Sequence, residues 1–358
     1  MTDFDTASPG KLGDASMRLE TDPRLDPRLA AALVMAGELA PGVEPPALGA
    51  SYEECLAYCA EFESANAAQN DQLRAIMPKF PDVEYSTQHI TGVDGNEIAL
   101  HIHRPIAASG ELPAIVHFHG GGMVLMSAED PGFERWRSSL AQQGLICIGV
   151  EFRNGGGRLG VHPFPAGLND CASAVQWVHD NAADLGVSGI VLSGESGGGN
   201  LSIATALKAN SEGWISQVSG VFAMCPYISG SYAQPPSSLR SLKENDGYLL
   251  NDAVMDALAR VYDPKVEQAD NPLAWPLQAT GSDLEGLPPT VISVNELDPL
   301  RDEGLAFYRK LLASGVSAVG RTVHGTPHAG DGMFPDVIPE VYADTLGAIA
   351  DFARRVCG

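Results

Sequence analysis

The alternation of short apolar runs with amphipathic stretches is the feature that most limits how this chain can fold. Each run is too short to be a buried helix and is therefore predicted to be a strand. Strands separated by helices form a parallel sheet that is covered on both faces. The chain is thus predicted to be an α/β protein. The predicted strands are residues 114–118, 145–150, 190–193, 218–224, 291–295 and 318–323, and the predicted helices are residues 131–143, 166–183, 200–210, 302–314 and 338–355.

Residues 1–80 follow a different pattern. An Ala/Leu/Met stretch at residues 29–40 predicts one helix, and Ser51 with Glu54 forms a capping box that predicts the start of a second helix, which runs toward Met77. The tetrapeptide DPRL at residues 22–25 is repeated at once, but a duplication this short is no repeat architecture. We expect no chemistry from these two helices themselves.

The region after residue 80 contains a hairpin and one long insertion. Residues 83–92 and 96–104 are predicted strands joined by the turn dipeptide Asp94-Gly95. Residues 227–287 contain no predicted strand, only loops and a helical piece at 251–262. A long insertion into a compact domain is usually functional, for example a lid. We therefore predict one domain over residues 81–358 that carries this insertion.

The composition excludes two classes of partner. The chain has 22 Lys+Arg and 45 Asp+Glu, a formal net charge of −23, which repels nucleic acid and anionic lipid head groups. No apolar run approaches the ~20 residues of a membrane span, and the first residues are acidic and polar, so a cytoplasmic protein is expected. The six scattered cysteines are expected to be mainly buried thiols and not a disulfide framework.

The most informative motif is GESGG at residues 194–198. It lies between a predicted strand and a predicted helix, the context in which a G-x-S-x-G motif exposes a nucleophilic serine. Its glycines allow a tight turn, and the start of the following helix favours negative charge. Ser196 is the candidate nucleophile. Taken alone, this pattern also fits a Gly-rich connection with an incidental serine.

A second motif, HGGG at residues 119–122, follows the predicted strand 114–118 directly. Acyl-transfer enzymes of this type place half of their oxyanion hole here, because backbone N–H groups without a neighbouring Cβ can approach the substrate oxygen closely. The candidate donors are Gly121, Gly122 and Gly197. His119 and Gly120 are expected to shape the loop.

Two further polar residues, an aspartate and a histidine, also follow predicted strands. Together with Ser196 they stand in the chain in the order Ser, Asp, His. Asp298 comes after strand 291–295 and His328 after strand 318–323, which predicts an orienting carboxylate and a general base. Asp302 and Glu303 fall at the start of a helix, where acidic side chains meet the helix dipole, so changes there are expected to affect mainly stability. His324 remains a rival to His328.

Two other patterns are interpreted as structural. GGGRLG at residues 155–160 matches a dinucleotide-binding pattern, but Pro163 and Pro165 oppose a helix there. The pairs His101/His103 and His117/His119 each share a strand face, yet no carboxylate or cysteine stands at a metal-site spacing from them.

These motifs together resemble the hormone-sensitive-lipase-like branch of the α/β-hydrolase esterases. The stretches that carry the resemblance are HFHGGGM at 117–123, GESGGGN at 194–200 and NELDPLRDEG at 295–304, with the late His328. The stretches at 152–171, 225–233, 244–250 and 270–276 are similar to a bacterial member that opens a macrocyclic lactone. The resemblance covers most of the chain from residue 83 and departs from the usual pattern at Met123 and around the histidine.

The resemblance implies an α/β-hydrolase fold with an eight-stranded, mostly parallel sheet and a helical cap made of residues 1–80 and the insertion. It also implies a serine carboxylesterase of carboxylic esters or lactones, with an acyl-enzyme intermediate and neither metal nor organic cofactor. We expect Met123, Glu195 and Tyr227 to line the substrate pocket. A non-catalytic small-molecule receptor, or an amidase or dehydratase on the same scaffold, is the alternative. The oligomeric state is left open, a homodimer included.

Overall fold

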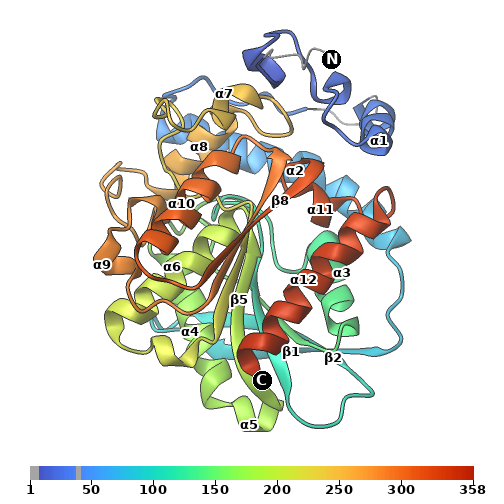
Figure 1. Cartoon of the computed structure of the whole chain (residues 1–358), viewed down its shortest axis with the longest axis vertical. Coiled ribbons are helices and arrows are strands. Elements are labelled where there is room, and N and C mark those ends of the chain that lie inside the picture. The colour runs from blue at the N-terminus through green and yellow to red at the C-terminus, as the bar shows by residue number, and fades with distance from the viewer. Residues whose placement is uncertain (1–7, 38–41) are drawn as a thin grey trace, which may run out of the picture.

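The structure is a computed structural model that describes residues 8–37 and 42–358, so residues 38–40 of the predicted helix 29–40 lie outside it. A central sheet is covered by helices on both faces (Figure 1). The strands are β1 (Val83–Thr91), β2 (Glu97–Pro105), β3 (Leu112–Phe118), β4 (Ile146–Val150), β5 (Val187–Glu195), β6 (Gly220–Met224), β7 (Thr290–Leu297) and β8 (Ala318–Pro327). The helices are α1 (Pro27–Gly37), α2 (Tyr52–Ile76), α3 (Pro131–Gln142), α4 (Ala166–Asp180), α5 (Ala182–Leu185), α6 (Gly197–Glu212), α7 (Ser241–Glu244), α8 (Asp252–Tyr262), α9 (Gly281–Leu284), α10 (Arg301–Ala313), α11 (Gly330–Met333) and α12 (Pro339–Cys357).

The strand order confirms the predicted α/β fold. The eight strands lie in the order β1-β2-β4-β3-β5-β6-β7-β8. The strands from β3 to β8 are parallel, while β1 and β2 form the predicted antiparallel hairpin and β2 pairs antiparallel with β4. Because the carboxyl ends of parallel strands meet at one edge of the sheet, the loops after β3, β5, β6, β7 and β8 lie close together there.

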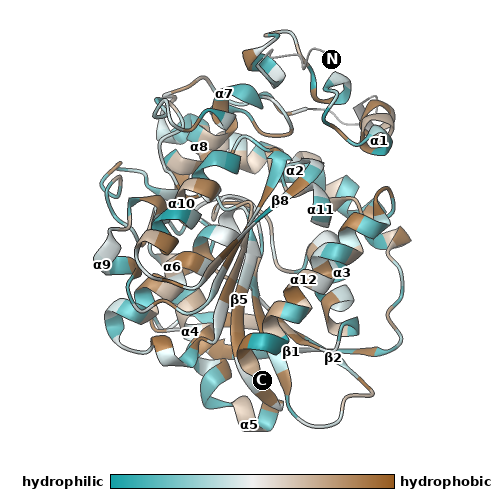
Figure 2. Cartoon of the chain, in the orientation of Figure 1, coloured by the Kyte–Doolittle hydropathy of each residue, from teal (hydrophilic) through white to brown (hydrophobic). Residues whose placement is uncertain are grey.

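The hydropathy of the elements explains the layers. Every residue of β4 and β6 is buried, as expected for strands covered on both faces. Figure 2 shows apolar strands at the centre and helices with hydrophilic residues on their outer sides. The helix α12 follows this rule, since its apolar residues Leu346, Ile349 and Phe352 are buried in the core on one face of the sheet.

The predicted helices and strands differ from the structure mainly at their ends. The strand predicted at 318–323 continues as β8 to Pro327, because β7 also continues and pairs Leu297 with Pro327 after a shift of register. The short helices α7, α9 and α11 were not predicted. Each is only four residues long, which is too short to show a helical periodicity.

The N-terminal residues and the insertion lie beside each other above the carboxyl edge of the sheet (Figure 1). The predicted capping box at the start of α2 is confirmed, because Glu54 N donates to Ser51 Oγ at 3.2 Å and Ser51 N donates to Glu54 Oε2 at 2.8 Å. The helix α2 packs against α8 of the insertion, and Gly49 N donates to Asp256 of α8 at 2.9 Å. Both regions are therefore placed over the loops that carry the motifs.

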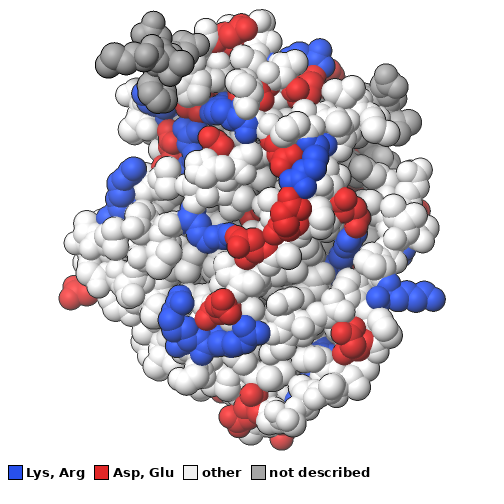
Figure 3. Space-filling model, turned by 45° about the vertical axis from the view of Figure 1, so that its right-hand side comes forward, with Lys and Arg blue, Asp and Glu red and all other residues white. Residues whose placement is uncertain are grey.

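The surface and the cysteines agree with the composition. On the face shown in Figure 3, acidic and basic side chains lie in mixed pairs. The six cysteines are free thiols, and all except Cys357 are buried. Within the described ranges, no helix is both long and apolar enough to cross a membrane.

Candidate active site

Ser196 lies at the turn between β5 and α6, with backbone angles φ 58° and ψ −116°. This left-handed conformation is strained for a residue other than glycine and is typical of functional turns. A Cβ at Gly194 would lie 2.3 Å from the carbonyl oxygen of Phe118, and a Cβ at Gly198 only 1.8 Å from it. The two outer glycines of the motif are therefore required by the close approach of β3.

The HGGG loop follows β3 and packs on this turn. Gly121 and Gly122 have φ values of 96° and 63°, which favour glycine. A Cβ at Gly197 would lie 2.5 Å from Met123 N and 2.7 Å from Gly122 N. The predicted oxyanion donors are thus brought together from two different segments.

Two polar side chains hold this loop in place. Glu195 accepts hydrogen bonds from Gly120 N at 2.8 Å and lies 3.0 Å from His117 Nε2. His119 is fully buried, stacks on Phe152 at 4.2 Å, and bonds through Nδ1 to the Gly120 carbonyl at 2.8 Å. Burial lowers the pKa of His119 to about 3. His119 is therefore neutral, as its expected structural role requires, and the contacts of Glu195 give it a role in shaping the loop.

His328 and Asp298 form a buried pair at the ends of β8 and β7. His328 Nδ1 lies 2.8 Å from Asp298 Oδ2, and Leu300 N donates to Asp298 Oδ1 at 2.8 Å. Burial by itself would lower the pKa of His328, but Asp298 and Cys225 outweigh burial and raise that pKa well above its ordinary value. The pair has the geometry of a general base with its orienting carboxylate.

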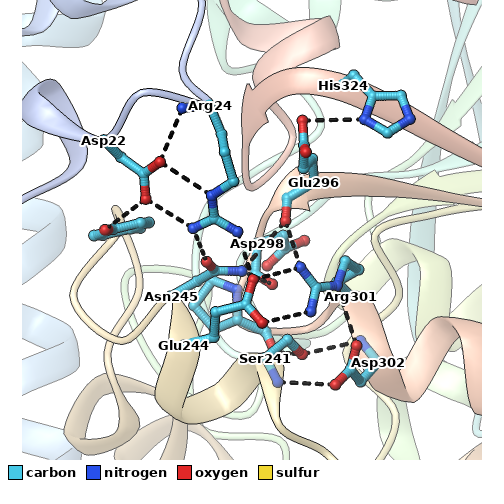
Figure 4. Close-up of polar contacts among 12 residues, drawn as sticks. Asp22, Arg24, Ser241, Glu244, Asn245, Glu296, Asp298, Arg301, Asp302 and His324 are labelled. Atoms are coloured by element: carbon cyan, nitrogen blue, oxygen red, sulfur yellow. Dashed lines mark hydrogen bonds and ion pairs between the residues drawn. The ribbon is translucent and has the colours of Figure 1, made fainter. Parts of the chain in front are cut away.

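His324, the alternative candidate for the general base, does not contact Asp298. His324 belongs to β8, its side chain is 77% exposed, and its Nδ1 pairs with Glu296 at 3.1 Å. Figure 4 shows its ring directed away from Asp298. Of the two histidines that the sequence left open, the structure pairs His328 with Asp298.

Cys225 is a site residue that the sequence reasoning missed. It is buried directly after β6 with φ 34°, and its Sγ and the donor atoms of Asp298 and His328 all lie within 4.8 Å of one another. Burial raises the pKa of its thiol. Among the described residues, these three are the group whose donor atoms could together hold a metal ion. The position of Cys225 directly after a predicted strand was the signal in the sequence that could have identified it.

The segment of Cys225 also connects the His328–Asp298 pair to Ser196. Ser196 N donates to the carbonyl of Met224 at 3.0 Å, and Met224 directly precedes Cys225. The turn that presents Ser196 is thus bonded to the segment that contacts His328. The candidate residues from β5, β6, β7 and β8 meet at one edge of the sheet.

The two carboxylates in the first turn of α10 also have partners outside that helix. Asp302 accepts from Ser241 N at 2.9 Å and pairs with Arg301. Glu303 is 1% exposed and accepts from Ile228 N at 2.7 Å. Both side chains lie in the first turn of α10 as expected, and the insertion also covers this turn and takes the Glu303 carboxyl group out of water.

Glu303 should make the stability of the fold depend on pH. Burial raises its pKa from 4.5 to about 8, so the folded state keeps a proton that the unfolded state has lost between these values. The free energy of unfolding should therefore fall as the pH rises from 4.5 to 8, by up to about 5 kcal/mol. Glu303→Gln should remove most of this dependence in denaturant titrations at pH 5.5 and 8.5.

The control for this measurement is Glu285→Gln, since Glu285 is exposed. That variant should keep the pH dependence of the unsubstituted protein. A Glu303→Gln protein whose stability falls with pH as steeply as the unsubstituted protein would contradict the assignment.

The remaining expected pocket residues are both buried. Met123 has φ 61° and is 1% exposed, next to the Gly197 turn. Tyr227 is 2% exposed, its hydroxyl donates to the Met255 carbonyl, and its ring stacks on Tyr232 at 4.5 Å. Met123 thus lies beside the predicted nucleophile, whereas the ring of Tyr227 packs against other residues of the insertion.

Comparison with known proteins defines the class. Residues 115–330 match the family model of the alpha/beta hydrolase fold. This chain is also 34% identical to the carboxylesterase NlhH of Mycobacterium tuberculosis over 253 residues, which cover 69% of this chain and 75% of that protein. The chain therefore belongs to the α/β-hydrolase fold family.

Solved structures narrow the placement within the family. Brefeldin A esterase, described as a bacterial homologue of human hormone sensitive lipase, is 42% identical with a TM-score of 0.89, covering 98% of this chain and 99% of that one. The esterase Est22 is 38% identical with a TM-score of 0.84, covering 94% and 98%. The predicted resemblance to the hormone-sensitive-lipase-like branch is confirmed.

Proposed function

We propose that this chain is a serine carboxylesterase in which Ser196, His328 and Asp298 form the catalytic triad. The observation that carries the proposal is the buried 2.8 Å contact of His328 Nδ1 with Asp298 at the sheet edge where the Ser196 turn lies. The relatives named carboxylesterase and esterase support this function.

The geometry supports one role for each group. Asp298 faces Nδ1 of His328, so Nε2 is the nitrogen that takes the proton from Ser196 as the serine attacks the ester carbonyl. The alcohol leaves with that proton, and a water molecule activated by the same histidine then hydrolyses the acyl-enzyme.

The oxyanion hole is made of backbone groups. The N–H groups of Gly121, Gly122 and Gly197 stabilise the negative charge that develops on the carbonyl oxygen. Their positions are set by the contact of Gly197 with Gly122 and by the bond from Gly120 to Glu195. Nucleophile, base and oxyanion donors are all protein groups, so the proposed reaction needs no cofactor.

A fluorophosphonate probe distinguishes an esterase from the non-catalytic receptor that the scaffold could also form. A serine activated by its histidine reacts with the probe covalently, and a binding-only protein stays unlabelled. Labelling of a peptide that contains Ser196 supports the proposal, and absence of labelling in the folded protein rejects it. An amidase would be labelled too, so substrate hydrolysis must accompany the probe.

We propose that lactones are substrates together with short linear esters. A lactone presents the same carbonyl to Ser196, and its leaving alcohol stays attached to the acyl group. A hydrolysis screen over acyl chain lengths and ring sizes should find turnover of linear esters and of at least one lactone. Turnover of linear esters with no lactone of any ring size would reject the lactone part, and Ser196→Ala is the blank for each substrate.

We propose that the protein is cytoplasmic, because its free thiols are typical of that reducing compartment.

We also propose that residues 1–80 and 227–287 form a cap that determines substrate size. Support for the cap comes from α8, because a Cβ at Gly122 would lie 2.8 Å from Leu258 Cδ1. The insertion thus touches the oxyanion loop directly.

Leu258→Ala should shift the preference toward longer or bulkier esters, because it opens space next to Gly122. The ratio of kcat/KM for a long ester to that for a short one should rise roughly tenfold, the effect of one or two methylene groups in an apolar pocket. This ratio does not depend on the folded fraction. Leu312→Ala, at an exposed position of α10, is the control. An unchanged ratio in Leu258→Ala would contradict the role of α8.

A further inference from the structure

The two copies of the duplicated tetrapeptide in the N-terminal segment make the same local side-chain hydrogen bonds, although the first copy is a turn and the second leads into α1. In each copy the aspartate accepts from the backbone and the guanidinium of the arginine two residues later: Arg24 N and Nη2 bond to Asp22 at 3.0 and 2.7 Å, and Arg28 N and Nη2 bond to Asp26, both at 2.8 Å. The Arg28 side chain is 48% exposed, whereas that of Arg24 is only 17% exposed. The two arginines thus bind the preceding aspartate in the same way and differ in their tertiary partners.

Arg24 reaches across to the insertion. Its Nη1 pairs with Glu244 Oε1 at 2.5 Å, and its Nη2 donates to Asn245 Oδ1 at 2.9 Å, as Figure 4 shows. Tyr248 of the insertion donates to Asp22 at 2.9 Å. The second partner of Arg28 is instead Glu340 on α12.

Glu244 and Asn245, the two partners of Arg24 in the insertion, also hold the loop of Asp298. Asn245 Nδ2 donates to the carbonyl of Asp298 at 3.0 Å and to that of Glu296 at 3.3 Å. Glu244 binds both terminal nitrogens of Arg301, at 2.8 and 3.0 Å, and Arg301 donates to the Glu296 carbonyl at 2.9 Å. The backbone on both sides of Asp298 is therefore fixed by neighbours of Arg24 (Figure 4).

The N-terminal segment also touches the strand that leads to His328. Asp26 N donates to the carbonyl of Gly325 at 3.0 Å, and Gly325 N donates to Glu296 Oε2 at 3.0 Å. The segment that carries the base is thus bonded to the N-terminal segment directly, and the loop of the orienting carboxylate is bonded to it through Glu244 and Asn245.

We propose that Arg24 is a positioning residue for the ester hydrolysis: through Glu244 and Asn245, the docked N-terminal segment holds Asp298 against His328. The inference rests on the proposed triad. It makes docking of the N-terminal segment a condition for full turnover, beyond any effect on substrate size.

Asp22, Arg24, Glu244 and Arg301 form a charged cluster, and its charge balance explains why the loss of Arg24 should disturb the site. Asp22 and Glu244 are almost fully buried and balance Arg24 and Arg301. Burial alone would raise the pKa of Glu244, but its two arginine partners outweigh burial and lower it. Removing one partner of a buried ion pair leaves an uncompensated charge, so the cluster rearranges. A displacement of catalytic groups by about 1 Å can cost on the order of 10²-fold in rate.

The test compares Arg24→Met with Arg28→Met in the full chain. Arg24→Met should lower kcat for a short ester roughly 10- to 100-fold with a smaller change in KM. The groups that face His328 are Asp298 and Cys225, which keep its pKa raised. A loosened Asp298 should therefore move the acidic limb of the kcat/KM profile to lower pH. Arg24→Lys should restore part of kcat, and Arg28→Met should match the unsubstituted enzyme.

A second variant guards against loss of folding. Asn245→Ala leaves the ion pairs intact and removes the bond to the Asp298 carbonyl, so it should reproduce the fall in kcat and the shifted limb even if Arg24→Met does not fold. Unchanged kcat and pH profile in either folded variant would overturn the positioning role, and so would a change in KM alone. Activity that survives in Ser196→Ala would instead refute the proposed function.

Discussion

Replacing Ser196 by alanine is expected to lower kcat for ester hydrolysis by on the order of 10⁶, the loss seen when a serine hydrolase loses its nucleophile. The alanine keeps the backbone atoms of the turn and removes only the Oγ that attacks the carbonyl. Because the oxyanion donors are backbone groups, some residual acceleration over water should remain. The measurement is kcat with a short aryl ester, together with fluorophosphonate labelling, which should disappear.

The control for this prediction lies on the same helix. Ser211 is exposed and its hydroxyl bonds to the Lys208 carbonyl, so Ser211→Ala should keep full activity and labelling. Circular dichroism and thermal unfolding should show both variants folded. Near-normal turnover in folded Ser196→Ala would refute the proposed mechanism.

The second large effect concerns the base. His328→Ala should also lower kcat by on the order of 10⁶, because nucleophile and base act as a unit. His324→Ala is the matched control on the same segment. Its exposed ring pairs with Glu296, so activity should be kept and stability should change by about 1 kcal/mol or less. Inactive His324→Ala with active His328→Ala would reverse the assignment.

Asp298→Asn completes this test. The amide keeps the shape of the carboxylate but no longer stabilises the imidazolium, so kcat should fall by on the order of 10⁴. Burial then acts on His328 with less opposition, and its pKa should fall. Because activity needs the neutral imidazole, the acidic limb of the residual activity should move to lower pH. A limb that moves to higher pH would contradict the assigned pair.

Much of the fold could be predicted because its determinants are local. Runs such as 145–150 and 218–224 are continuously apolar since both faces of their strands are covered, and the structure has β4 and β6 there. The turn at Asp94-Gly95 required no knowledge of the sheet, since the dipeptide itself favours a hairpin. The four-residue helices α7 and α9 were not predictable in this way, because four residues are too few to show a helical periodicity.

In the candidate site too, some features could be predicted from local sequence and others depend on tertiary packing. The glycines around Ser196 and after His119 mark backbone approaches that only glycine permits, and these requirements are visible in the residues themselves. Glu303 shows the opposite case. Its position at a helix start was predicted, but the insertion also buries it, and no neighbouring residue in the sequence indicates that cover.

The sequence alone determined the alternation of strands and helices, the turn that presents Ser196 and the order of the polar residues that follow the strands. These features follow from side-chain periodicity and backbone sterics, which act over a few residues. Only the tertiary structure decided that His328 and not His324 meets Asp298, that Cys225 contacts this pair, and that Arg24 and Arg28 have different partners. Such choices depend on distances between segments far apart in the chain, and those distances are determined by packing of the whole fold.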